Sequence, residues 1–265
     1  TEIQVINLGC GFDTLFFRWA KQTKKCLDPS VDVENKNGAL NIVKFLDLDV
    51  WEMIDQKKRI IAKHAELKEI AEAHKDIYFP ITCDLSSAVD FGKALQTAGV
   101  DPTKPTFILA ECVLVYIDAK QSNELLTYIT QQSFPNNENV LLVSYDMIGP
   151  DDRFGKMMIE NLIKMGLSIR SIDALKGYKD HEARCSSCGF AQTKGMTMKA
   201  LYTTVSREAQ ILLNKLEIID DWDEWGLVHE HYCFILASTN KTEGFAIPMP
   251  FPRPTNVPLF GGFSK

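Results

Sequence analysis

Short apolar runs alternate with longer amphipathic segments along most of this chain. The apolar runs predict strands at residues 3–8, 43–50, 76–83, 106–113, 140–145 and 231–238. Between them, apolar residues at helical spacing predict helices at 54–73, 88–98, 122–132, 152–165 and 206–216. Strands that are apolar almost throughout and alternate with helices are typical of a parallel sheet covered on both faces. The pattern therefore predicts an α/β fold built on a doubly wound parallel sheet.

Two stretches depart from this alternation. Residues 28–40 are polar and contain Pro and Gly, which indicates an insertion at the surface. From residue 239 the chain is rich in proline, a composition that favours an extended strap or a flexible tail. We therefore predict a domain over residues 1–238 and a proline-rich tail over residues 239–265.

The first predicted strand runs directly into Gly9-Cys10-Gly11, and an amphipathic segment follows. Glycines at such a turn let the backbone approach a ligand, and the N-terminus of the next helix points at it. The dinucleotide fingerprint requires a third glycine where this chain has Thr14, which disfavours NAD and FAD. S-adenosylmethionine, which has no pyrophosphate, remains compatible with the turn. A glycine turn that binds no ligand is the alternative.

Acidic residues follow the next three predicted strands: Asp47 and Asp49, then Asp84, then Glu111. The carboxyl ends of parallel strands form the ligand-binding edge of an open α/β sheet. Asp49 could accept both hydroxyls of a ribose, and Asp84 an adenine amino group, with Leu85 supplying backbone contacts. Glu111 could hold the ammonium group of a methionine moiety.

Each of these acids has a structural alternative. Carboxylates at strand ends can cap the helix that follows, an alternative that applies most to Asp84. We expect Asp47 to be an inward-facing partner rather than a ligand contact. Glu111 lies in an otherwise apolar run, where an unpartnered carboxylate is costly to bury, and this favours a functional role.

Composition excludes some classes of function. The chain has 265 residues, 45% of them hydrophobic and 24% charged, as is ordinary for a globular protein. The net charge of −6 disfavours broad nucleic-acid binding. No apolar run approaches the ~20 residues of a membrane span, and no signal peptide is visible before the first predicted strand. An odd number of cysteines, seven, indicates reduced thiols and a cytoplasmic location.

We interpret three short clusters of residues as structural features rather than as binding sites. Cys185-x-x-Cys188 with His181 has the spacing of zinc ligands, but without a second pair we expect a loop with incidental cysteines and no metal. The acidic and aromatic stretch 220–225 predicts a helix end or lid. The basic triplet 57–59 predicts a solvated helix face rather than a nucleic-acid patch.

Several longer motifs resemble those of the leucine carboxyl methyltransferase family, in the family's order from residue 3 to about residue 238. The resemblance is carried by NLGCGFDT at 7–14, ILAECVLVY at 108–116, DRFGKMMIENL at 152–162, DDWDEW at 220–225 and HYC at 231–233. It implies the class I S-adenosylmethionine-dependent methyltransferase fold, a Rossmann-like doubly wound sheet with additional helices. It also implies methylation of the α-carboxylate of the C-terminal leucine of protein phosphatase 2A-type catalytic subunits.

By position, the resemblance places Gly9 and Gly11 at the cofactor turn, Asp49 at the ribose, Asp84 and Leu85 at adenine, and Glu111 near the methionine part. Two departures stand out: the family's N-terminal helical segment is not part of this sequence, and the stretch between Gly11 and Asp49 is longer than usual. A related branch methylates the wybutosine precursor in tRNA, and a non-catalytic scaffold with the same fold is a further alternative.

Methylation of a carboxylate needs no general base, because the acceptor is already ionised at neutral pH. Catalysis would come from aligning the reacting atoms and excluding water. The substrate pocket then needs donors, and we predict Arg153, Tyr116 and Tyr145, which lie at or after the ends of the fourth and fifth strands. Arg153 could instead pair with acids at a helix start, and the tyrosines could be packing residues.

Overall fold

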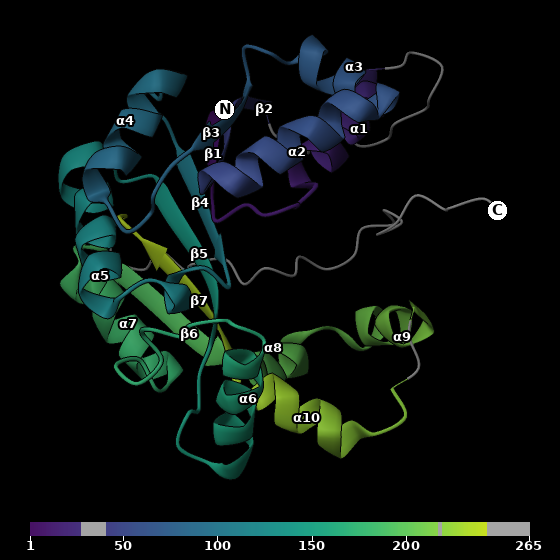
Figure 1. Ribbon diagram of the computed structural model, residues 1–265, viewed down its shortest axis with the longest axis vertical. Coiled ribbons are helices and arrows are strands. Elements are labelled where there is room, and N and C mark those ends of the chain that lie inside the picture. The colour runs from purple at the N-terminus through teal and green to yellow at the C-terminus, as the bar shows by residue number, and fades with distance from the viewer. Residues whose placement is uncertain (28–40, 217–218, 243–265) are drawn as a thin grey trace.

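The computed structural model describes residues 1–27, 41–216 and 219–242. Its centre is a seven-stranded sheet in the order β3-β2-β1-β4-β5-β7-β6 (Figure 1). The strands are β1 (Glu2–Leu8), β2 (Asn41–Asp49), β3 (Tyr78–Thr82), β4 (Thr106–Glu111), β5 (Val140–Met147), β6 (Gln192–Thr197) and β7 (Tyr232–Ser238). All six predicted strands are present, and the predicted α/β class is confirmed.

Helices cover both faces of this sheet. Figure 1 shows α1 (Leu15–Leu27), α2 (Trp51–Lys63) and α3 (Ala65–Ala73) on one side. On the other side lie α4 (Ala88–Ala98), α5 (Ala119–Tyr128) and α7 (Tyr178–Ser187). Beyond one end of the strands lie α6 (Arg153–Lys164), α8 (Met198–Thr204), α9 (Arg207–Leu216) and α10 (Trp222–Glu230).

The expectation of a wholly parallel sheet is wrong for one strand, β7, against which the edge strand β6 is also paired. β1 to β5 are parallel, but β7 runs antiparallel between β5 and β6, with Leu141 opposite Ser238. The apolar run of β7 predicted a strand, but such a run carries no information on direction. β6 was not predicted, because this edge strand is only half-buried and lacks an apolar run.

Two predicted helices are interrupted. The segment predicted as one helix over 54–73 is α2 and α3, separated at His64, whose φ of −103° and ψ of 114° are extended. The segment predicted over 122–132 is α5 followed by a single π turn at Ile129–Ser133. At α6 the Asp152 side chain accepts a hydrogen bond from Gly155 N at 2.7 Å and caps the helix.

Alternate side chains of the central strands enter different hydrophobic clusters. From β1, Ile6 and Leu8 pack into the cluster beneath α4 and α5, whereas Val5 packs with Phe16 and Phe45 beneath α1. Because both faces of the strand are buried, its sequence is apolar almost throughout rather than alternating. Because β1 to β4 are parallel, their carboxyl ends lie at the same end of the sheet, and the polar residues at these ends lie close together.

The two irregular segments are mostly outside the described part of the chain. The predicted insertion at 28–40 and residues 243–265 of the predicted tail lie outside the described residues, and the division into domain and tail stays a prediction. Thr239 is still attached to the sheet: its amide donates to Val140 O at 3.1 Å and its hydroxyl to Asn137 O at 2.6 Å. No helix within the described ranges is long and apolar enough to cross a membrane.

Candidate functional site

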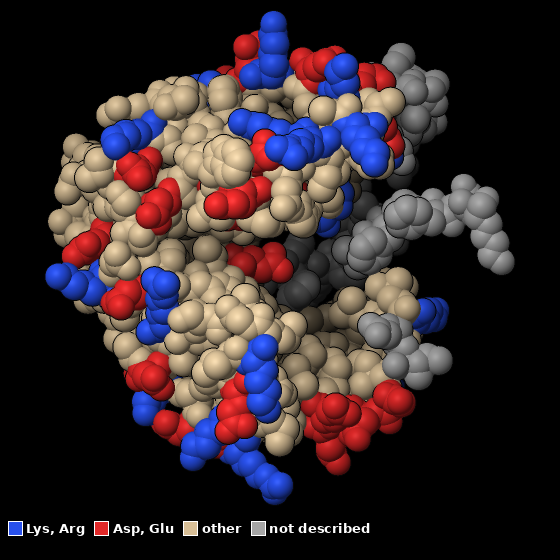
Figure 2. Space-filling model, viewed as in Figure 1, with Lys and Arg blue, Asp and Glu red and all other residues tan. Residues whose placement is uncertain are grey.

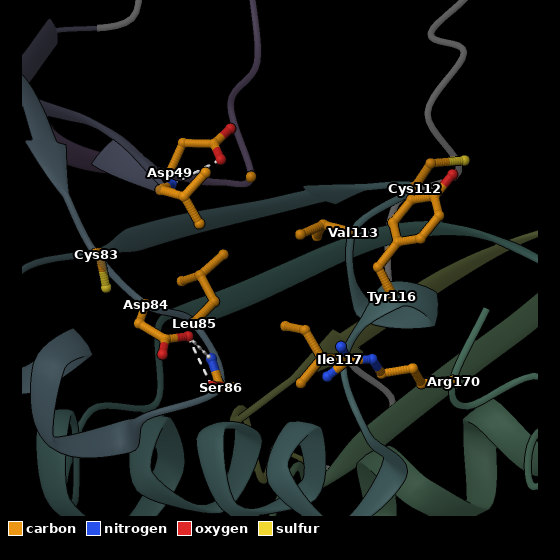
Figure 3. A pocket seen from close by; sticks show the side chains of 12 residues that line it. Asp49, Cys83, Asp84, Leu85, Ser86, Cys112, Val113, Tyr116, Ile117 and Arg170 are labelled. Carbon is orange, nitrogen blue, oxygen red and sulfur yellow. Dashed lines mark hydrogen bonds between the residues drawn. The ribbon is translucent and has the colours of Figure 1, made fainter. Parts of the chain in front are cut away.

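A cavity of about 490 Å³ opens at the carboxyl ends of β1 to β4 (Figure 3). Its volume is in the range of small-molecule sites. Five of the residues predicted from sequence line it: Gly9, Asp49, Asp84, Leu85 and Tyr116. The other lining residues are Val50, Cys83, Ser86, Cys112, Val113, Ile117 and Arg170. In the space-filling view, acidic side chains are visible inside the hollow between the two halves of the molecule (Figure 2).

The glycine turn is fixed by its backbone and by its neighbours. Gly9 has φ +61° and Gly11 has φ +45°, both in the left-handed region that favours glycine. A Cβ at Gly9 would overlap the side chain of Val113, whereas one at Gly11 would meet only Met53 Cε at 3.9 Å. Gly9 is therefore required both for conformation and for space, and Gly11 mainly for conformation.

Asp49 holds this turn from the end of the neighbouring strand. Its Oδ2 accepts a hydrogen bond from Gly11 N at 2.8 Å, and its Oδ1 accepts one from Val50 N, also at 2.8 Å. A carboxylate has about four lone-pair sites, so two such bonds leave both oxygens able to accept from a ligand. Gly11 does not line the cavity, but this bond ties it to a residue that does.

Asp47 points into the protein, as expected, and belongs to a buried polar network. Its Oδ2 lies 2.6 Å from Lys57 Nζ and accepts from Tyr78 OH at 2.7 Å, while Oδ1 accepts from Asn7 Nδ2 at 3.1 Å. Burial raises the pKa of Asp47, although Lys57 opposes that shift. The expectation of a solvated basic face is wrong for Lys57, which is only 4% exposed.

Asp84 is exposed at the end of β3, and its Oδ1 accepts from the backbone N and the hydroxyl of Ser86 at 2.9 and 2.7 Å. It does not cap the next helix: Ser87 caps α4 by accepting from Asp90 N at 3.2 Å. Asp84 thus closes a local turn and keeps its carboxylate at the cavity. Leu85 beside it is buried in the core and also lines the cavity.

Glu111, the last residue of β4, differs from expectation, and the backbone of Cys112 directly after it is unusual. Glu111 is exposed and does not line the cavity, so the argument that it is a costly buried carboxylate is wrong. Cys112 has φ +48°, a conformation that non-glycine residues rarely adopt and that turns the chain into the cavity wall. Burial raises the pKa of the Cys112 thiol to about 12, which disfavours a nucleophilic role.

Only one of the three predicted substrate-side residues lines the cavity. Tyr116 is half-buried and lines the cavity, and burial raises the pKa of its hydroxyl. Tyr145 does not line it: its ring stacks on Tyr232, with centroids 5.2 Å apart. Arg153 is exposed as the first residue of α6 and also lies outside the lining. The neighbouring Asp152 accepts from His231 Nε2 at 3.0 Å, which joins α6 to the end of α10.

The paired cysteines are part of the core rather than of a loop, contrary to expectation. Cys185 and Cys188 lie at the end of α7 and just after it, 1% and 2% exposed. Beside them, burial and Arg184 lower the pKa of His181 to about 3. The part of the chain that the structure describes has no group of three or more His, Cys, Asp or Glu side chains arranged to hold a metal.

Comparison with known proteins agrees with the motifs. A sequence model described as "Leucine carboxyl methyltransferase" matches residues 36–130, which include Asp49, Asp84, Leu85, Glu111 and Tyr116. The "Leucine carboxyl methyltransferase 1 homolog" of Arabidopsis thaliana is 28% identical over 246 residues, covering 88% of this chain and 68% of that protein. The Bos taurus "Leucine carboxyl methyltransferase 1" is 27% identical over 243 residues, covering 91% and 70%. The chain is similar in sequence to the leucine carboxyl methyltransferases over most of its length.

The similar proteins include the tRNA wybutosine branch as well as the leucine carboxyl methyltransferases. "tRNA wybutosine-synthesizing protein 4" of Aspergillus fumigatus is 25% identical over 252 residues, which cover 89% of this chain but 22% of that protein. Among solved structures, the citrinin polyketide synthase CMeT domain has a TM-score of 0.51 at 10% identity, covering 91% of this chain. "PigF with SAH" has a TM-score of 0.50 at 10% identity, covering 88%. The chain spans about half of each solved chain, 47% and 50%, and the likeness confirms the class I methyltransferase fold.

Seven of the residues that line the cavity were not predicted from the sequence. Val50, Ser86 and Cys112 directly follow residues that were singled out, so their proximity was available from the sequence. Arg170 was not, because it lies in the connection between α6 and α7, where no periodic pattern or motif marks it. It is the one basic residue among the described residues that line the cavity.

Proposed function

We propose that this protein transfers the methyl group of S-adenosylmethionine to a carboxylate and forms a methyl ester. The observation that carries the proposal is the cavity itself, in a chain similar in sequence to the leucine carboxyl methyltransferases. The glycine turn after β1, Asp49 at the end of β2, and Asp84 with Leu85 after β3 border one space. A scaffold without a ligand would not need a polar cavity with two strand-end carboxylates.

The residues present suit this cofactor by their chemistry. Asp49 has acceptor capacity left for ribose hydroxyls, since each of its oxygens accepts one protein hydrogen bond. Asp84 offers an acceptor for an amino group, and Val50, Leu85 and Ile117 supply apolar surface for a base. Glu111, exposed one residue before Cys112, stays a prediction as the partner of the methionine ammonium group.

The reaction makes modest demands on this chain's own groups. The bound cofactor supplies an electrophilic methyl group, and a carboxylate oxygen of the acceptor attacks it. One C–O bond forms, one C–S bond breaks with its electron pair leaving on sulfur, and no proton moves. The protein therefore has to align the two reactants and exclude water rather than provide a base. The Tyr116 hydroxyl is protonated at neutral pH, as in an ordinary tyrosine, and can donate to the acceptor carboxylate; burial raises its pKa further.

For the acceptor we propose the C-terminal leucine carboxylate of a protein phosphatase 2A-type catalytic subunit. The names of the relatives support a leucine carboxylate as the acceptor, and the phosphatase is what the resemblance of the sequence motifs implies. Charge supports it over tRNA: the net charge is −6, and acids lie before and within the first turn of α10, among them Asp220, Asp221, Asp223 and Glu224. Such a surface repels a phosphate backbone.

The test is transfer of labelled methyl from S-adenosylmethionine to a purified phosphatase 2A catalytic subunit. The matched control is the same subunit without its terminal leucine. We expect label on the intact subunit only, and its release as methanol in mild base, as an ester requires. Labelling of tRNA in place of the phosphatase would support the wybutosine branch. A lack of transfer to either acceptor by a chain that binds the cofactor would contradict both acceptor assignments.

A further inference from the structure

Arg170 is held at the cavity by its own backbone. Its amide donates to Val115 O at 2.9 Å, and the next amide, that of Ser171, donates to the same carbonyl at 3.2 Å. The Ser171 hydroxyl donates to Leu114 O at 3.2 Å. These bonds attach the connection after α6 to the short turn Leu114–Tyr116, which forms one wall of the cavity. The position of Arg170 is therefore set by the same turn that positions Tyr116 and Ile117.

The guanidinium group of Arg170 is available to a ligand. The residue is exposed, and the side chain extends into the cavity beside Ile117 (Figure 3). Asp49 and Asp84, the two acids of the lining, are engaged by backbone or serine donors. For the guanidinium group, by contrast, the described part of the structure records no hydrogen bond or ion pair. The nearby buried cation, Lys57, is committed to Asp47.

The location of this group within the cavity indicates which part of a ligand it meets. In Figure 3, Arg170 and Ile117 face the side of the cavity where Leu85 and Ser86 lie, while Asp49 lies at another side. Asp49 is hydrogen-bonded to the glycine turn through Gly11 N. Leu85 and Ile117 are apolar, and Asp84 presents a carboxylate acceptor there. An apolar slot with one acceptor and a planar cation suits an amino-substituted aromatic base, because a guanidinium plane packs well on an aromatic face.

We propose that Arg170 packs its guanidinium group against the adenine of the bound cofactor and so contributes to its affinity. This inference rests on the proposed function, since it takes S-adenosylmethionine as the ligand. It adds a binding residue from outside the span that the family's sequence model matches, residues 36–130. The competing role for the same cation is an ion pair with the carboxylate of the cofactor's amino-acid part.

Two ligands separate these roles. S-adenosylhomocysteine carries adenine, ribose and the amino acid, whereas 5′-methylthioadenosine carries adenine and ribose without the amino acid. Calorimetric titration of Arg170→Ala should show an affinity about fivefold weaker for both ligands, by the same factor. Arg170→Lys keeps the charge but loses the plane, so it should not restore the affinity. The matched control is Arg59→Ala, which removes an exposed arginine that pairs with Asp55 on α2.

The outcomes are distinct. A loss for S-adenosylhomocysteine alone would overturn the inference in favour of the ion pair with the amino-acid carboxylate. Unchanged affinity for both ligands in Arg170→Ala would overturn it while leaving the cofactor assignment intact. If the unaltered protein binds neither ligand, the proposed function itself fails. Because the side chain of Arg170 is exposed, the variants should unfold at the temperature of the parent, which a thermal melt checks.

Discussion

Replacing Gly9 by alanine tests how the cavity is built. At φ +61° an alanine costs about 1–2 kcal/mol through its backbone conformation alone. The added Cβ would also lie 2.7 Å from Val113 Cβ and closer still to one of its methyl groups. Crowding of this kind costs about 1–3 kcal/mol. Val113 packs against the main hydrophobic cluster, which limits how far its side chain can move away. The total expected loss of unfolding free energy is therefore about 2–5 kcal/mol.

Gly166 provides a matched control for the conformational part. It has φ +80°, and a Cβ built there meets nothing within 4 Å. Gly166→Ala should therefore lose only about 1–2 kcal/mol, and the difference between the variants measures the clash with Val113. The assay is urea denaturation, combined with titration of S-adenosylhomocysteine. Gly9→Ala should abolish binding and Gly166→Ala should leave it unchanged. Equal stability losses, or intact binding by Gly9→Ala, would refute the reasoning.

Three further changes test other parts of the account. Lys57→Met leaves the buried Asp47 carboxylate without its cation, and urea denaturation should show an unfolding free energy lower by about 3–5 kcal/mol. Adding Asp47→Asn should recover much of this loss. No recovery in the double variant would argue against the ion pair. Asp146 lies in β5, and burial raises the pKa of its carboxyl group to about 7. The folded protein therefore binds the carboxyl proton more tightly than the unfolded chain does. The stability that this proton contributes is present below about pH 4 and is lost as pH rises through 7. Denaturation at pH 5 and pH 8 should show that decline in the parent protein and a smaller one in Asp146→Asn. Tyr116→Phe should slow methyl transfer with little change in cofactor affinity, and Arg153→Ala, outside the cavity, should slow it less; the reverse order in initial rates would restore the sequence-based role of Arg153.

The sequence predicted the residues whose position depends on local structure. Gly9, Asp49, Asp84 and Leu85 each follow an apolar strand, and the parallel arrangement of these strands brings them to one edge. Glu111 shows the limit of this reasoning, because an apolar neighbourhood in sequence did not mean burial at the end of a strand.

Residues whose position depends on remote contacts could not be predicted. Arg170 reaches the cavity because its backbone pairs with Val115, more than 50 residues earlier in the chain. Lys57 looked like part of a solvated face, but its partner Asp47 lies on another element. The edge strand β6 is half-buried and has no apolar run, so its place beside β7 follows only from the folded sheet.

Calorimetric titration of S-adenosylmethionine into this protein tests the central claim most directly, with Asp49→Asn as the comparison. The account predicts saturable binding at a single site by the parent protein. It predicts much weaker binding by the variant, because Asp49 both holds Gly11 N and faces the cavity. Absence of binding by the folded parent protein, or equal binding by Asp49→Asn, would contradict the assignment of this cavity as the cofactor site.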